Sequence, residues 1–84
     1  MVNWPIQITM PRRGESGETI FRTHYEGSCN ASDVTEDNSG TTAQIDGTPE
    51  DAAGGSAAVC IENGKVFLYD EENENWRKQF SFQE

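Results

Sequence analysis

The sequence has few of the residues from which metal and nucleic-acid sites are built. It contains one histidine, His24, and two cysteines, Cys29 and Cys60, with no CxxC motif. A structural zinc site usually takes four such ligands, so the composition argues against one. The chain has six lysines and arginines but 15 acidic residues, so its formal net charge is -9. Phosphate binding depends on clustered cations, so this charge argues against nucleic acid and anionic membranes as partners.

Long apolar runs are also lacking. No stretch approaches the roughly 18 apolar residues of a membrane-spanning helix. The opening MVNWPIQITM has neither the basic flank nor the apolar length of a secretory signal. We therefore expect the chain to be cytoplasmic at synthesis, where Cys29 and Cys60 would be free thiols. The sequence leaves open whether these two cysteines are near each other.

Apolar residues make up only 33% of the 84-residue chain. This length predicts a single small domain over residues 1–84 with a modest core. Such low apolar content favours either a disordered portion or stabilisation by neighbouring subunits.

Residues 58–82 predict a three-stranded meander. An apolar run ends at Asn63-Gly64, and the run Val66-Phe67-Leu68-Tyr69 follows. Both residues of Asn63-Gly64 tolerate a positive φ, so we expect them at the centre of a type I′ turn. A polar turn over residues 70–75 precedes the last strand, which starts at Trp76. The predicted core consists of Val59, Ile61, Val66, Leu68, Trp76 and Phe80; an exposed aromatic contact surface is the alternative for the aromatics.

The N-terminal segment predicts a strand with one apolar face. Trp4, Ile6, Ile8 and Met10 alternate with Pro5 and polar residues. Pro5 lacks an N–H group, which indicates a strand start or a sheet edge. Residues 18–25 predict a second strand that pairs with the first as a hairpin. A domain this small has difficulty covering the first strand's apolar stripe, so we expect Trp4, Ile6, Ile8 and Met10 to form an interface.

Residues 26–57 are rich in Gly, Ser, Thr, Asp, Asn and Ala and predict a long central loop that is either mobile or ordered by a partner. Within it we expect a brief strand over residues 42–45. Thr48 and Pro49 suit the start of one helical turn, or of a tight turn, before Gly54. Asp33, Thr35 and Asp37 alternate like calcium ligands, but no glutamate occupies the closing position of an EF-hand loop.

No residue pattern indicates catalysis. His24 has no second histidine for a metal, and no nucleophile lies in a recognisable motif, so we interpret it as a strand surface residue. The Arg12-Arg13 pair is interpreted as a solvated loop. We expect no enzyme activity, no cofactor and no small-molecule substrate.

The run GTPEDAAGGSAAVCIENGKVFLYDEENENW resembles a segment of small virion proteins from tailed phages and prophages of Gram-positive bacteria. The matching features are a glycine-serine lead, an apolar strand, a Gly-containing turn, a Lys-Val-aromatic strand, and an acidic turn closed by tryptophan. They lie at Gly55-Ser56, 59–61, Asn63-Gly64, 65–69, 70–75 and Trp76. The resemblance covers about a third of the chain and carries over no catalytic residue. It implies a capsid, head-fibre, neck or tail component.

Two functions follow as hypotheses. The first is a non-enzymatic phage structural protein that forms homo-oligomers or docks on a capsid or tail protein, and so passes from the cytoplasm into the virion. The alternative is a soluble acidic protein-binding module in the cytosol, such as an inhibitor or nucleic-acid mimic. For both, the predicted fold is all-β: a small antiparallel sheet or sandwich with a C-terminal meander, a long central loop and at most one helical turn.

Overall fold

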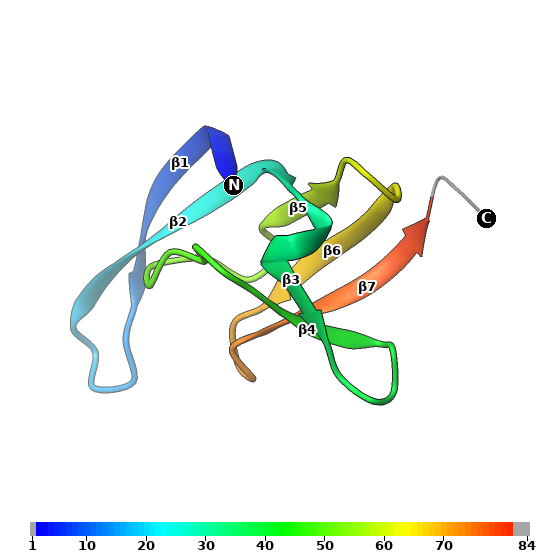
Figure 1. Cartoon of the computed structure of the whole chain (residues 1–84). Helices are drawn as coiled ribbons and strands as arrows, with labels where there is room; N and C mark the ends of the chain where they lie inside the picture. The colour runs from blue at the N-terminus through cyan, green and yellow to red at the C-terminus, as the bar shows by residue number, and fades with distance from the viewer. Residues whose placement is uncertain (1, 82–84) are drawn as a thin grey trace.

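The computed structural model describes residues 2–81, and of residues 80 and 81 the main chain only. The described chain is all-β, as predicted (Figure 1). Its strands form one sheet in the order β1-β2-β5-β6-β7-β4-β3, and its single helical segment is the 3₁₀ turn η1 (Ala31–Asp33). The strands are β1 (Asn3–Arg13), β2 (Thr19–Cys29), β3 (Val34–Glu36), β4 (Thr42–Ile45), β5 (Ala57–Cys60), β6 (Lys65–Asp70) and β7 (Asn75–Ser81).

The C-terminal meander has the predicted strands, since β5 pairs with β6 and β6 with β7, both antiparallel. The predicted type I′ turn at Asn63-Gly64 is wrong. A four-residue loop, 61–64, joins β5 to β6, and of these residues only Gly64 has a positive φ, at 71°. The Gly64 N–H donates to the Cys60 carbonyl at 2.8 Å. The four-residue loop is closed by this hydrogen bond and needs only one residue in the left-handed conformation, which glycine adopts without steric cost.

The central segment 26–57 is more structured than a long loop. It contains the end of β2, η1, the expected strand β4 and the unpredicted strand β3, which pairs with β4. Because the chain crosses from β2 to the far edge of the sheet and returns, β5 pairs with β2 in parallel, while all other strand pairs are antiparallel.

The sheet is curled, so that Trp4 of β1 and Val34 of β3, from its two end strands, both pack against the core. β3 and β4 cross in front of β5, β6 and β7 in Figure 1. At the other end of the strand order, the Trp4 indole of β1 donates its Nε1–H to the carbonyl of Gly47, just after β4, at 3.3 Å. Curling of this kind allows a single sheet to enclose its own apolar face.

Large aromatic side chains in the core lie opposite small ones. Trp76 of β7 is paired with Ala43 of β4, and Phe67 of β6 with Ala58 of β5. Trp76, Phe67 and Ala58 are fully buried. Alanine at the paired positions leaves room for each ring, which is how close packing is reached in a small volume. The buried core cluster comprises Cys29, Ala43, Ile45, Ala58, Cys60, Phe67 and Trp76.

The predicted core list is therefore partly wrong. Trp76 and Val66 are buried, and Val59 is half-buried. Ile61 is 63% exposed because it follows the end of β5 and belongs to the loop. Leu68 is 36% exposed, since Phe67 takes the inward position beside it on β6. The Phe80 side chain lies outside the described residues. On β5 the inward face carries the small residues Ala58 and Cys60, where prediction had favoured the larger ones.

The connection from β4 to β5, residues 46–56, contains tight turns and no helix. The Ala52 N–H donates to the Pro49 carbonyl at 3.3 Å. Thr48 does not cap a helix. Its Oγ1 donates to the Ile45 carbonyl at 2.6 Å and accepts from Trp76 Nε1 at 2.9 Å. The predicted capping residue thus satisfies the one polar atom of the buried Trp76 ring.

Candidate interaction surface

A β-bulge near the start of β1 divides the predicted apolar stripe between two faces. Asn3 is paired with Ser28, but Ile6 is paired with Glu26, so β1 has one residue more than β2 in this interval. An extra residue reverses the alternation of side chains. Trp4 consequently points into the core, where its ring packs on Tyr25 and Trp76. The prediction that Trp4 shares an exposed face with Ile6, Ile8 and Met10 is wrong.

Gly27 on β2 leaves the room that the start of β1 needs for Trp4 to turn into the core. A Cβ at Gly27 would lie 1.8 Å from the main-chain oxygen of Asn3 and 2.9 Å from Cε3 of Trp4. Any larger residue would push the start of β1 away from β2. Close backbone approach is a common reason for glycine inside a strand.

Beyond the bulge, Ile6, Ile8 and Met10 share the outer face of the β1–β2 hairpin and are 46%, 54% and 46% exposed. We call these three side chains the β1 stripe. They are uncharged, neighbouring and apolar, in a chain with a net charge of -9. A contiguous apolar patch on a polar surface is typical of an interaction site.

The charged residues beside the β1 stripe are paired with one another. On β2, His24 Nε2 and Glu26 Oε2 are 2.8 Å apart. Glu71, in the β6–β7 turn, forms a salt bridge with Arg12 and lies 3.6 Å from Arg22 Nε. The predicted solvated Arg12 therefore has a partner. The Arg12–Glu71 salt bridge reduces the free charge next to the apolar side chains.

The open edge of β1 is defined by the hydrogen bonds of β2. The Thr23 N–H donates to the main-chain carbonyl of Asp51, and the Thr23 carbonyl accepts from the Ala53 N–H, both at 2.8 Å. The main-chain groups of Thr23 therefore point away from β1. Thr9 lies directly opposite Thr23. In an antiparallel pair, directly opposed residues either bond each other or both point away. The N–H and carbonyl of Thr9 therefore point to the open edge, and those of Gln7 do so by the same alternation.

A polar network holds the inner face of the hairpin to the domain. Asp51 accepts hydrogen bonds from the Thr23 and Tyr25 hydroxyls, each at 2.6 Å, and Thr23 Oγ1 lies 2.8 Å from Thr9 Oγ1. These hydroxyl donors lower the pKa of the Asp51 carboxyl below its ordinary value, while the bond to Asp51 raises the pKa of Tyr25. The network fixes the orientation of the β1 stripe relative to the core.

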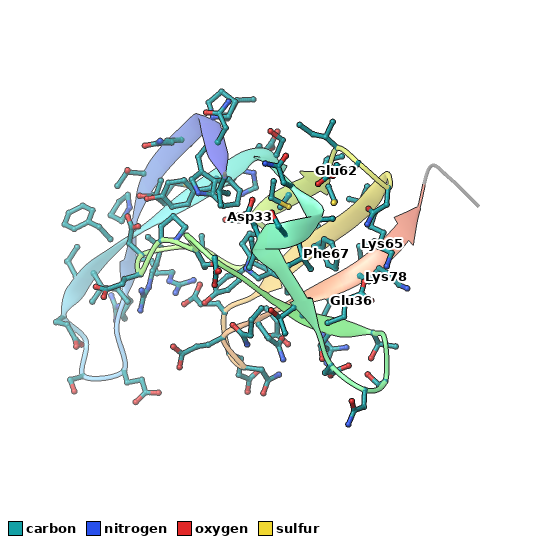
Figure 2. The ribbon with its side chains drawn as sticks, viewed as in Figure 1. Asp33, Glu36, Glu62, Lys65, Phe67 and Lys78 are labelled. Atoms are coloured by element: carbon teal, nitrogen blue, oxygen red, sulfur yellow. The ribbon has the colours of Figure 1, made fainter. Side chains whose placement is uncertain are left out.

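A separate cleft of about 240 Å³ lies between β3 and the β5–β6 hairpin. Figure 2 shows Glu36, Lys65 and Phe67 around it. Lys65 Nζ and Glu36 Oε1 form an ion pair at 2.7 Å, so each charge already has a partner. Near one end, Glu62 Oε1 accepts the Ala31 N–H at 2.6 Å. Two of the groups that line the cleft, Lys65 and Glu36, are thus already bonded to each other.

Of the three alternating residues with calcium-like spacing, only Asp33 and Asp37 serve turns, and the two turns are separate. Asp33 accepts the Asn30 N–H at 3.0 Å within η1, and Thr35 lies on β3. Asp37 binds the turn to β4 through Ser39, Gly40 and Thr42. Across residues 2–81, no three His, Cys, Asp or Glu side chains are grouped so that they could hold a metal ion. No helix within the same range is long and apolar enough to cross a membrane.

Sequence reasoning missed the bulge, the role of Gly27 and the Asp51 network. The combination of Pro5 in a strand with Gly27 in its partner was the available signal, because both residues concentrate at irregular points of a sheet. No comparable signal marked Asp51, which lies 28 residues from Thr23 in the chain.

Comparison with known proteins returned no relative. No family model, no curated protein and no solved structure matches this chain.

Proposed function

We propose that this chain is a non-enzymatic assembly protein that associates through the β1–β2 hairpin. The observation that supports this most directly is the β1 stripe: Ile6, Ile8 and Met10 are about half exposed, on an edge strand that is anchored to the core at Trp4. Covering exposed apolar surface is worth about 25 cal/mol per Å², so an interface here gains stability that the isolated chain lacks.

The setting we propose is the particle of a tailed phage. This part of the proposal depends on the resemblance of residues 47–76 to small virion proteins. That segment forms the turn before β5, the strands β5 and β6, and the start of β7, and it contributes Phe67 and Trp76 to the core. The β1–β2 hairpin lies outside the segment, so the residues that resemble virion proteins would build the domain while the hairpin contacts its partner. That partner would be a further copy of the chain or a capsid or tail protein.

Charging the stripe tests the proposal. The double substitution Ile6→Glu and Ile8→Glu should abolish self-association in light scattering and attachment to particles in co-sedimentation. Both side chains are about half exposed, so the variant should keep the wild-type circular dichroism spectrum. Phe21→Glu is a matched control, because Phe21 is 62% exposed but lies on the other face of the hairpin, with Thr23 and Tyr25.

The control variant should assemble normally. If the wild-type chain stays monomeric at high concentration and fails to attach to particles assembled without it, the proposal is wrong. Binding instead to a soluble host protein, with no affinity for particles, would favour the acidic cytosolic module.

A further inference from the structure

The residues between the two prolines of β1 have the same character when read in either direction from Ile8. The segment is Pro5-Ile6-Gln7-Ile8-Thr9-Met10-Pro11. Polar residues flank Ile8, apolar residues follow, and a proline stands at each end. We propose that β1 pairs with β1 of a second copy, antiparallel, about a two-fold axis at Ile8. This inference rests on the proposed function and names the partner as another copy of the chain.

The main-chain groups required for this pairing are in place. Gln7 and Thr9 point their N–H and carbonyl groups to the open edge of the sheet, as their pairing with Tyr25 and Thr23 requires. In the two-fold arrangement, Gln7 of one copy faces Thr9 of the other, and each pair exchanges two hydrogen bonds. Pro5 faces Pro11, and neither has an N–H group to donate. The prolines therefore end the ladder on both sides, which limits the pairing to a short, defined register.

The side chains select this register over its neighbours. With the axis at Ile8, the two Ile8 side chains face each other and Ile6 faces Met10. Moving the partner by two residues in one direction sets Ile6 opposite Arg12. The opposite shift sets Met10 opposite position 4, where the bulge has turned Trp4 into the core. Apolar cross-strand pairs are favoured over apolar–charged ones, so the axis at Ile8 is preferred.

The charge distribution also favours pairing between copies at this edge. The first acidic residue in the sequence is Glu15, so β1 contains none of the 15 acidic side chains. Arg12 and Arg13 stand at its end. Two chains that each have a net charge of -9 repel each other. Because β1 has no acidic residue, pairing through β1 places no carboxylate of one paired strand beside a carboxylate of the other. Added salt should therefore strengthen the association by screening the remaining repulsion.

Cysteine cross-linking tests the register. Opposed residues that do not bond each other have Cα atoms about 4.5 Å apart, within the range that a disulfide spans. Under mild oxidation with diamide, Ile8→Cys alone should give covalent dimers. Ile6→Cys alone and Met10→Cys alone should not, but a mixture of these two variants should. The wild-type chain is the control, because Cys29 and Cys60 are each 1% exposed.

The outcomes separate this inference from the proposed function. If the chain is dimeric in light scattering but Ile8→Cys does not cross-link, or if Ile6→Cys cross-links with itself, the pairing is wrong. A chain that stays monomeric at high concentration yet attaches to particles overturns the pairing and leaves the proposed function standing. If Ile8→Cys cross-links as expected but particles still bind the Ile6→Glu, Ile8→Glu variant, the pairing stands and particle docking through the stripe is overturned.

Discussion

Trp4 and Trp76 stack in the core with ring centroids 5.7 Å apart and planes inclined by 8°. One ring belongs to the first strand and the other to the last. Both indoles donate to the segment after β4, Trp4 to Gly47 and Trp76 to Thr48. The stack therefore joins the beginning, the middle and the end of the chain, and it fixes the position from which the rest of β1 extends.

Truncation of Trp76 should remove most of the stability of the domain. Trp76→Ala is expected to destabilise the fold by about 3–5 kcal/mol, because a buried large aromatic leaves a cavity. Phe21→Ala, at a side chain that is 62% exposed, should stay within about 0.5 kcal/mol of wild type. Urea unfolding followed by circular dichroism measures both. Equal midpoints for the two variants would contradict a central role for Trp76.

A methyl group at Gly27 should displace the start of β1. Gly27→Ala places a Cβ against Asn3 and Trp4 and should cost about 1–3 kcal/mol, the range of overpacked sites. Gly54→Ala is the matched control, since the nearest atom to its Cβ is 3.6 Å away, in ordinary contact. Thermal melts compare the two variants. Tryptophan fluorescence should also shift to the red only for Gly27→Ala, as Trp4 becomes hydrated; an unchanged spectrum and midpoint would argue against the close approach.

The Asp37 carboxyl should titrate unusually low. Hydrogen bonds from Ser39 and Thr42 lower its pKa from 3.8 to about 2. Because the folded pKa is below the unfolded one, this contribution to stability is present above about pH 4 and is lost as the pH falls toward 2. Carboxyl ¹³C NMR should place the midpoint near 2 in wild type and higher in Ser39→Ala. An identical midpoint in the two proteins would rule out the Ser39 bond as a cause.

The two thiols should be inert in the folded protein. Cys29 and Cys60 are directly opposed on β2 and β5 and are free. Burial raises the pKa of Cys29 to about 11, so about one molecule in 1,000 carries its thiolate at pH 8. Iodoacetamide should label Cys29 far more slowly in the native than in the unfolded protein. Melting with and without reductant should give the same midpoint; a higher midpoint after mild oxidation would show that the pair forms a disulfide.

Local patterns were sufficient to predict most strands. Alternating and apolar runs located β1, β2 and the meander, and even the four residues of β4, because strand preference and turn residues act over a few positions. The all-β class followed from the same signals. β3 was missed because its three residues, Val34-Thr35-Glu36, are a strand only through their pairing with β4.

The face of β1 on which each apolar side chain lies could be assigned only from the tertiary structure. A two-residue period predicts which side chains share a face only while the strand is regular, and the bulge before Ile6 separates Trp4 from Ile6, Ile8 and Met10. The sequence therefore determined that β1 carries an apolar stripe, but not that Trp4 leaves it for the core.

The sequence by itself determined the class of the fold, the charge that surrounds the stripe, and the pseudo-symmetric order of residues between Pro5 and Pro11. The tertiary structure decided that β1 lies at an edge, that Gln7 and Thr9 direct their main-chain groups outward, and that Ala58 and Cys60 face the core in place of Val59 and Ile61. These properties depend on contacts between residues far apart in the chain. Such contacts form only when the whole sheet curls around Trp76 and Phe67, so no local pattern contains them.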